Sequence, residues 1–294
     1  MLNLTKKVQM KKQYVSLLVI LLAASGFLFS CGNTVNKSAG ALEFDSIQVN
    51  EVAHLFGDTA KPGCNIIINF AYANKSSDEK LKDSLNTYFL SACFGEKYMG
   101  MTPEEAVKKY TEKYVGDYRK DLEPMYRKDE QDKENAEDMG AWYSYYKGIE
   151  SHVQLYTGHL LVYRIDYNEY TGGAHGIYMS TFLNLDLRTL APIRLDDLFV
   201  NDYKEQLTDL LWNQLMADNK VATRQELEDM GYVTTGDLTP TENFYLSKDG
   251  ITFYYNVYDI APYVMGPVKI TLPYEMMQHL LSDETMVLND LRNP

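Results

Sequence analysis

The chain has 294 residues, of which 41 are acidic and 28 are lysine or arginine, so its formal net charge at pH 7 is −13. A nucleic-acid-binding protein needs the opposite sign of charge, and this class of function is excluded. A strongly negative surface favours solubility and attracts basic partners. The length suits one large domain or two small ones.

The N-terminus is typical of a secretory signal. Four lysines within the first twelve residues precede an apolar run from Tyr14 to Phe29, which is short for a membrane span. The run ends in Leu28-Phe29-Ser30-Cys31-Gly32, which is similar to a bacterial lipobox although Phe29 is bulkier than the strict pattern allows. We therefore predict a lipoprotein signal peptide over residues 1–30 and acylation of Cys31, which would anchor the chain to a membrane. The alternative is an ordinary export signal with an incidental cysteine.

Residues 31–43 follow as a polar stretch without apolar periodicity, and we predict a flexible tether. The tether contains no acidic run of the kind that directs some lipoproteins to the cell surface, so we expect a periplasm-facing position in the cell envelope, at the outer membrane. Cleavage before Cys31 would remove four of the 28 basic side chains and none of the 41 acidic ones, and would shift the net charge from −13 to −17.

Two further cysteines, Cys64 and Cys93, are the candidates for a disulfide. An oxidising compartment would allow this bond, which would close a loop of about 30 residues and contribute about 3 kcal/mol in the chain-entropy model. Their separation lacks the close spacing of a zinc or C-x-x-C redox site. Two free buried thiols are the alternative.

The clearest change of composition is the charged run at residues 128–138, which has no apolar residue larger than alanine. We place a domain boundary at its end, between residues 44–138 and residues 139–294. Before it, residues 64–73 predict a strand and Leu81 to Ala92 predict an amphipathic helix. A second helix begins with the capping box at residues 102–105 and is expected to end or kink at Pro124. The tyrosines along this helix are expected to be core, with a sugar-stacking platform as the alternative.

After residue 140 the pattern predicts strands. Apolar residues alternate with polar ones at 149–155 and at 161–168, and a three-residue loop, Thr157-Gly158-His159, aligns the two apolar faces. That register pairs Leu155 with Leu161, Val153 with Tyr163 and Ile149 with Tyr167, and it sets His152 opposite Arg164. A third strand at 177–187 makes residues 170–176 the connection between two antiparallel strands.

The remaining chain predicts helices around 195–199 and 203–216, a hairpin at 244–258 about Lys248-Asp249-Gly250, and a last strand at 268–274. Segregated strands and helices with short connections predict an α+β fold of antiparallel sheet packed with amphipathic helices.

The connection Tyr170-Thr171-Gly172-Gly173-Ala174-His175-Gly176 (the glycine loop) combines three glycines with one histidine. One interpretation is a tight turn in which Gly172 and Gly173 supply positive φ angles; another is a binding surface. No G-x-S-x-G elbow, H-x-x-x-H pair or phosphate-binding loop accompanies it, so we predict no catalytic residue, metal or cofactor. A site made of paired carboxylates remains open, because 41 acids always allow some pair.

The glycine loop, the segments 182–187 and 195–199, the hairpin at 244–250 and the segment 258–267 together resemble the domain of unknown function 3298 family, with matching order and separations across residues 140–280. Residues 45–130 resemble, less specifically, the companion domain 4163. The chain is thus similar to the PdaC/RsiV-like group, which includes a lysozyme-binding anti-sigma factor and a peptidoglycan deacetylase. The chain lacks the T-F-D-D type deacetylase motif.

The resemblance implies an envelope binding or sensing module whose ligand is a lysozyme-like muramidase or peptidoglycan. Candidate contact residues lie on the glycine loop and on the segment 258–267, and we expect the two segments to meet at one rim of the sheet. One alternative is an envelope hydrolase or esterase that uses His175 with Asp166 or Asp259, and another is a structural envelope lipoprotein. The candidate binding residues are Tyr170, Gly172, Gly173, His175, Pro262 and Tyr263.

Overall fold

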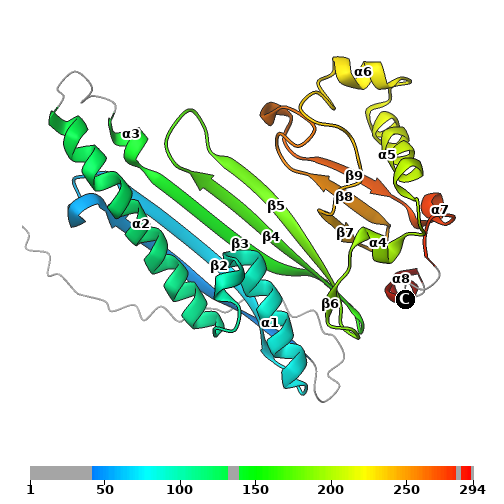
Figure 1. Ribbon diagram of the computed structural model, residues 1–294, viewed down its shortest axis with the longest axis horizontal. Coiled ribbons are helices and arrows are strands. Elements are labelled where there is room, and N and C mark those ends of the chain that lie inside the picture. The colour runs from blue at the N-terminus through cyan, green and yellow to red at the C-terminus, as the bar shows by residue number, and fades with distance from the viewer. Residues whose placement is uncertain (1–41, 132–138, 283–285, 293–294) are drawn as a thin grey trace, which may run out of the picture. The chain divides into compact units, whose positions relative to one another are not determined.

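The computed structural model describes residues 42–131, 139–282 and 286–292. These residues belong to one compact unit, Ser38–Pro294, and form two sheets with helices (Figure 1), so the predicted α+β class is confirmed. Cys31 and the predicted signal peptide lie outside the described residues. The strands are β1 (Glu43–His54), β2 (Gly63–Lys75), β3 (Tyr145–Tyr156), β4 (Leu160–Tyr170), β5 (Ile177–Asp186), β6 (Ala191–Pro192), β7 (Phe244–Leu246), β8 (Ile251–Tyr255) and β9 (Val268–Leu272). The α-helices are α1 (Glu79–Phe94), α2 (Pro103–Gln131), α3 (Met139–Tyr143), α4 (Leu195–Leu198), α5 (Lys204–Asn219), α6 (Arg224–Asp229), α7 (Tyr274–Met277) and α8 (Met286–Arg292).

The larger sheet has the strand order β1-β2-β3-β4-β5-β6. Its neighbours are antiparallel except for β2 and β3, which run parallel, so the sheet is mixed and not purely antiparallel as predicted. Strand β1 was not predicted. Because β2 from before residue 138 pairs directly with β3 from after it, the predicted boundary at residue 138 does not divide the chain into separate sheets.

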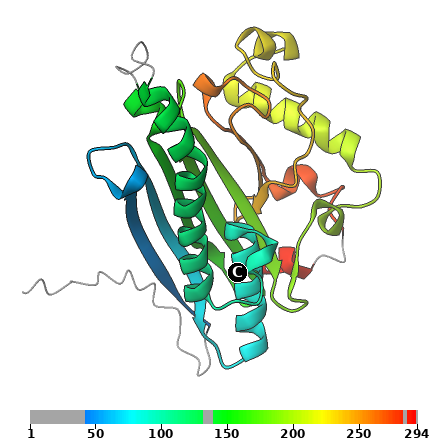
Figure 2. The same cartoon turned by 60° about the vertical axis from the view of Figure 1, so that its left-hand side comes forward.

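Helices α1 and α2 cover one face of this sheet (Figures 1 and 2). On β4, alternate residues point to that face, where Leu161, Tyr163 and Ile165 are buried in one cluster with the apolar side of α1. Tyr163 stacks on Phe89 with ring centroids 3.9 Å apart, and its hydroxyl donates to the carbonyl oxygen of Ala71 at 2.6 Å. The sequence periodicity of β4 is therefore explained by packing against α1.

Helix α2 begins as predicted, because the backbone N–H of Glu105 donates to Thr102 Oγ1 at 3.2 Å. The helix does not end at Pro124, one of the two predicted outcomes, but continues to Gln131. Proline removes one backbone hydrogen bond. Buried residues on both sides of it, Tyr118 and Tyr126, pack into one cluster and offset that loss. Tyrosines of this helix are core, as expected.

The hairpin of β3 and β4 keeps most of the predicted register: Ile149 pairs with Tyr167, His152 with Arg164 and Val153 with Tyr163. The predicted pair of Leu155 with Leu161 is wrong, because the register shifts between Val153 and Leu155 and Leu155 pairs with Val162. Such a bulge adds one residue to one strand near the turn. The bulge lets Leu155 pack against the core cluster that contains Leu160 and Val162.

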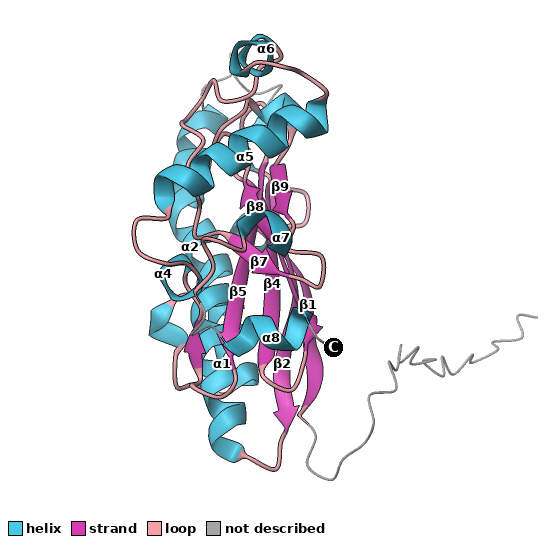
Figure 3. Cartoon of the chain, turned by 90° about the vertical axis from the view of Figure 1, so that its right-hand side faces the viewer, coloured by secondary structure: helices cyan, strands magenta, loops and turns pink. Residues whose placement is uncertain are grey.

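The second sheet has the order β7-β8-β9 and is antiparallel, which confirms the predicted hairpin and last strand. Helix α5 packs against β9 of this sheet (Figure 3). The residues of β4 that face away from α1, Leu160 and Val162, are buried in the same cluster as the side chains of this sheet and of α5. Strand β4 is therefore covered on both faces at its beginning. Among the described residues, no helix is long and apolar enough to cross a membrane.

The predicted disulfide is not formed, because Cys64 and Cys93 are both free and buried. Cys93 lies in the cluster under α1, whereas Cys64 lies in a different cluster beside the second half of α2. Burial raises the pKa of the Cys93 thiol to about 12, and burial likewise raises the pKa of Cys64. The structure therefore agrees with the alternative prediction of two free buried thiols.

Candidate functional site

The face of the large sheet that α1 and α2 leave uncovered carries a cavity of about 560 Å³. Arg164, Asp166 and Asn168 reach it because they alternate along β4 with residues that pack under the helices. Glu150 enters from β3, at the position directly opposite Asp166. The lining consists of Ile67, Asn69, Tyr146, Gly148, Ile149, Glu150, Arg164, Asp166, Tyr167, Asn168, Tyr178, Met179, Ser180 and Tyr254.

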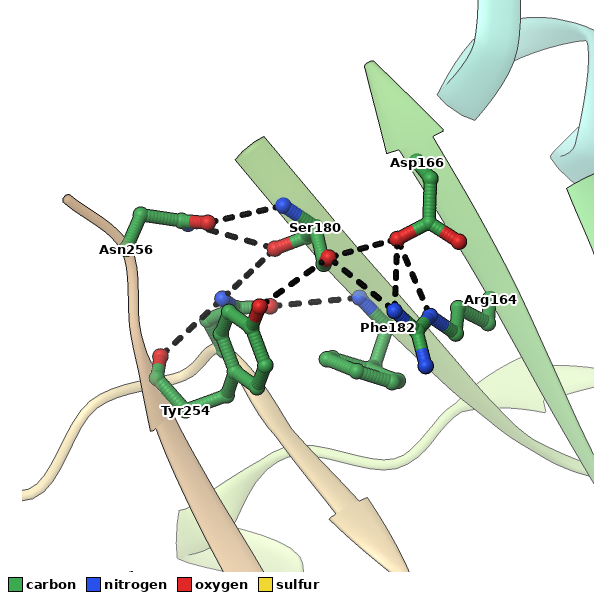
Figure 4. Close-up of polar contacts among 7 residues, drawn as sticks. Arg164, Asp166, Ser180, Phe182, Tyr254 and Asn256 are labelled. Carbon is green, nitrogen blue, oxygen red and sulfur yellow. Dashed lines mark hydrogen bonds and ion pairs between the residues drawn. The ribbon is translucent and has the colours of Figure 1, made fainter. Parts of the chain in front are cut away.

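A hydrogen-bonded group forms one wall of the cavity (Figure 4). Asp166 Oδ1 accepts from Arg164 Nε at 3.0 Å, from Arg164 Nη2 at 2.8 Å and from the Ser180 hydroxyl at 2.5 Å. The Tyr254 hydroxyl donates to Ser180 Oγ at 3.2 Å. Charge-assisted bonds of this kind fix side-chain geometry. Arg164, Asp166 and Ser180 therefore form a rigid wall.

Two asparagines attach the edge of β5 to the second sheet. The backbone N–H of Ser180 donates to Asn256 Oδ1 at 2.7 Å, and the backbone N–H of Phe182 donates to Asn243 Oδ1 at 3.2 Å. Both amides also donate to the carbonyl oxygen of Ser180, at 3.2 Å from Asn256 and 3.0 Å from Asn243. These side chains take the place of a neighbouring strand and satisfy backbone groups that an edge strand leaves open. These hydrogen bonds fix the position of β5, which carries Ser180 of the cavity wall, relative to the second sheet.

The glycine loop has the geometry predicted for a tight connection. Gly172 and Gly173 have φ angles of +85° and +101°, and a Cβ atom at Gly172 would lie 2.7 Å from the carbonyl oxygen of Trp142. The Tyr170 hydroxyl donates to the carbonyl oxygen of Gly173 at 2.9 Å, and Nδ1 of His175 lies 3.0 Å from the carbonyl oxygen of Gly176. The loop presents His175 to solvent.

The expected meeting of the glycine loop with the segment 258–267 is confirmed. The rings of His175 and Tyr263 stack with centroids 4.4 Å apart and planes inclined by 24°. Nε2 of His175 lies 3.4 Å from the Tyr258 hydroxyl, and Tyr263 also contacts Tyr178 at 5.6 Å between centroids. We call these four residues, His175, Tyr178, Tyr258 and Tyr263, the aromatic rim. Pro262 precedes the short 3-10 helix Tyr263–Met265 that carries Tyr263.

The aromatic rim and the cavity are continuous, because Tyr178 belongs to both. The rim is exposed: Tyr178 and Tyr258 keep 37% and 45% of their surface accessible, and the neighbouring Val264 keeps 90%. Exposed aromatic residues next to a concave polar surface are typical of a binding site. The rim and the cavity together are the candidate site.

Among the described residues, the hydrogen-bonding side-chain neighbour of His175 is the Tyr258 hydroxyl and not an acid that could orient it for catalysis. No hydrogen bond joins His175 to a carboxylate in the part of the chain that is described; Asp166 is bonded to Arg164 and Ser180, and Asp259 accepts from the backbone N–H of Asn256 at 2.7 Å. Nor do the described residues contain a group of three or more histidine, cysteine or acidic side chains that could hold a metal ion. The hydrolase alternative therefore gains no support from this geometry.

The sequence identified His175 and Tyr263 of the rim but did not single out Tyr178, Tyr258 or the cavity beside them. The predicted register sets His152 opposite Arg164, and the structure confirms this pair on the strands that carry Glu150 and Asp166. The second sheet, whose Tyr254 and Asn256 close the cavity on one side, could not be placed on that face from local patterns. The available signal was polar residues at every second position, Glu150, His152 and Gln154 on β3 and Arg164, Asp166 and Asn168 on β4.

Comparison with known proteins matches two stretches of the chain to two family models. The family model described as a protein of unknown function (DUF3298) matches residues 196–275, and that of the deacetylase PdaC matches residues 59–178, which includes the glycine loop. A solved DUF3298 family member from Bacteroides fragilis is 69% identical, with a TM-score of 0.84, and the comparison covers 88% of this chain and 100% of that one. The chain belongs to the DUF3298 family.

Two more distant relatives of this DUF3298 protein extend the comparison. A DUF3298 family protein from Pseudomonas aeruginosa has the same fold, with a TM-score of 0.59 at 16% identity over 83% of this chain and 95% of its own. The peptidoglycan-N-acetylmuramic acid deacetylase PdaC of Bacillus subtilis is 26% identical over 127 residues, which are 41% of this chain. The matched part spans only 26% of that enzyme's length.

Proposed function

We propose that this DUF3298 protein is a binding or sensing module of the bacterial cell envelope, and that its ligand is peptidoglycan or a lysozyme-like muramidase. The observation that carries the proposal is the aromatic rim. Two segments that are distant in sequence bring His175 and Tyr263 into a stack beside an open polar cavity. Such an arrangement presents a rigid surface to a ligand without requiring a catalytic group.

The similarity to PdaC supports a role of this protein in the cell envelope. That relative is a peptidoglycan-N-acetylmuramic acid deacetylase, and its family model matches strands β2, β3 and β4, which line part of the cavity, and the glycine loop. The shared segment is a quarter of the enzyme, so we propose a common ligand environment and not a common activity. The assignment of residues 44–138 to the companion domain 4163 remains a prediction.

Charge supports the muramidase as a ligand. The chain carries a net charge of −13, and lysozymes are basic, so long-range attraction would raise the association rate at low ionic strength. Geometry supports peptidoglycan, because tyrosine rings beside carboxylate and amide groups suit the apolar faces and the hydroxyl groups of a sugar.

The location that goes with this proposal is the one expected from the sequence: a lipoprotein anchored through Cys31, facing the periplasm at the outer membrane. Labelling cells with a radioactive or alkyne-bearing fatty acid tests it. Incorporation into the wild-type chain and its absence in Cys31→Ala would support the anchor, and equal labelling of both would contradict it.

A pull-down tests the proposed function. The unit Ser38–Pro294 contains both sheets and their cores, so a fragment of residues 42–294 keeps every described element. We expect the immobilised fragment to retain lysozyme or to sediment with purified insoluble peptidoglycan at low salt. Retention of neither would contradict the proposal and would favour a purely structural lipoprotein.

Two tyrosines provide a matched pair of variants. Tyr178 of the rim and Tyr156 at the other end of the β3–β4 hairpin are each 37% exposed. Tyr178→Ala should weaken retention, whereas Tyr156→Ala should leave it unchanged. Equal loss in both variants would show that the rim is not the binding surface.

A further inference from the structure

The cavity beside the rim holds more hydrogen-bond acceptors than the protein itself uses. Oδ1 of Asp166 receives three hydrogen bonds, while within the described residues its second oxygen, Oδ2, receives none. The carboxylate of Glu150 makes no hydrogen bond or ion pair with any described residue. Oδ1 of Asn69 is buried without a partner in the described structure. Asn69 Oδ1 is closed to solvent, whereas Glu150 is exposed and Asp166 is partly exposed, so the free oxygens of these two carboxylates can accept hydrogen bonds from a ligand.

The charge of the lining points the same way. The lining includes two carboxylates, Glu150 and Asp166, and one guanidinium, Arg164, which is already paired with Asp166 at 2.8 Å. The two carboxylates come from directly opposite positions of β3 and β4, where like charges repel. A hydroxyl or ammonium group placed between them would relieve this repulsion, whereas a carboxylate on the ligand would increase it.

The floor of the cavity depends on a glycine. A Cβ atom at Gly148 would lie 2.8 Å from the Tyr146 hydroxyl and 3.4 Å from its ring, so Tyr146 lies over the space that a side chain would occupy. Four tyrosines, Tyr146, Tyr167, Tyr178 and Tyr254, line the cavity together with the polar groups. The volume of about 560 Å³ lies within the range of small-ligand sites, about 300–1,000 Å³, and fits one or two sugar rings.

We propose that this cavity is a saccharide subsite that takes neutral or amino sugars through their hydroxyl and amino groups and rejects sugars that carry a carboxylate. Glu150 and Asp166 Oδ2 accept from the ligand, and the tyrosine rings pack against its apolar faces. The inference rests on the proposed function and names the ligand class of that site.

Three soluble disaccharides of similar size and the same β-1,4 linkage test the subsite on the fragment 42–294: that of N-acetylglucosamine, that of glucosamine, and that of glucuronic acid. Dissociation constants would be measured by isothermal titration calorimetry or by NMR titration. We expect the two uncharged or cationic sugars to bind at least tenfold more tightly than the acidic one.

Variants assign the binding to the cavity. Glu150→Gln removes one charge from an exposed position, so we expect it to fold normally, to weaken the amino sugar at least fivefold and to narrow its advantage over the acidic sugar. Gly148→Ala displaces Tyr146 and should weaken all sugars at least fivefold. The control is Glu51→Gln, which makes the same change at an exposed position of β1 outside the cavity, and it should leave every constant unchanged.

Several outcomes would overturn the inference: no binding of the uncharged and cationic disaccharides, equal binding of all three, or equal losses in Glu150→Gln and Glu51→Gln. If these occur while peptidoglycan or lysozyme is still retained in the pull-down, the subsite is wrong and the proposed function stands. If retention also fails, both are wrong.

Discussion

His175 and Tyr263 stack at 4.4 Å between ring centroids, although strands β5 to β8 and helices α4, α5 and α6 separate them along the chain. The contact joins the loop between β4 and β5 to the short 3-10 helix before β9. Local contacts position each residue. Nδ1 of His175 contacts the carbonyl oxygen of Gly176 within the glycine loop. The turn that carries Tyr263 is closed by a hydrogen bond from the Met265 N–H to the Pro262 carbonyl oxygen at 2.9 Å. The stack is therefore a fixed feature of the surface.

The energy of this stack can be measured directly. We expect His175→Ala and Tyr263→Ala each to lower the free energy of unfolding by about 1 kcal/mol, because both side chains lie at the surface. A double-mutant cycle should give a coupling energy of about 0.5–1.5 kcal/mol, the value usual for aromatic pairs. Urea denaturation of the four proteins provides the measurement. A coupling energy of zero would mean that the two rings do not contact each other in solution.

Asn243 should contribute strongly to stability for a residue at the junction of two sheets. Asn243→Ala leaves the Phe182 N–H without its acceptor and removes donors from two carbonyl oxygens, those of Ser180 and Tyr254. Unpaired buried polar groups cost about 1–3 kcal/mol, so we expect a loss of this size in the free energy of unfolding. Asn50→Ala on the exposed side of β1 is the control and should change it by less than about 0.5 kcal/mol. Equal effects would contradict the bridging role.

The free cysteines predict a specific reactivity. Thiolate is the reactive form, and burial raises the pKa of Cys93 to about 12, so this thiol stays protonated and shielded at pH 8. We expect iodoacetamide to leave both thiols of the fragment 42–294 unmodified under native conditions and to alkylate both in denaturant without a reducing agent. Mass spectrometry would detect this, and two unreactive cysteines in denaturant would indicate the disulfide that the structure lacks.

The carboxyl group of Asp186 makes the free energy of unfolding depend on pH. Burial raises the pKa of its carboxyl, but hydrogen bonds from Arg188 outweigh burial, and the net pKa is lowered. A carboxyl with a lowered pKa in the folded state adds stability above its unfolded pKa, and this stability is lost as the pH falls through the folded value. We expect Asp186→Asn to be less stable than wild type at pH 7 and the difference to shrink towards pH 3 in denaturation experiments. A difference that grows towards pH 3 would contradict this.

Local patterns predicted most elements of the fold because their causes are local. Alternation on β4 reflects packing of Tyr163 under α1, and the positive φ angles of Gly172 and Gly173 follow from the turn they form. Where the cause was long-range, the sequence misled: Pro124 stays helical because Tyr118 and Tyr126 hold both sides of it in one cluster. The disulfide was inferred from compartment and count alone, although Cys64 and Cys93 lie in different clusters.

The candidate site likewise has a part that local motifs predicted and a part that depends on long-range contacts. Tyr170, Gly172, Gly173, His175, Pro262 and Tyr263 were found from the two motifs, and the structure brings the motifs into contact. Their role in binding stays a prediction. The cavity was out of reach, since Ser180 and Tyr254 meet only when the second sheet packs against β5.

The most direct test of the binding role is the affinity of the rim variant. The dissociation constant of the fragment 42–294 for lysozyme, or for soluble peptidoglycan fragments, would be measured for wild type, Tyr263→Ala and Tyr156→Ala under the same low-salt conditions. We predict that at least one ligand binds wild type and Tyr156→Ala equally well and binds Tyr263→Ala at least tenfold more weakly. Unchanged affinity in Tyr263→Ala, or no binding of either ligand to wild type, would contradict the assignment of the aromatic rim as a binding surface.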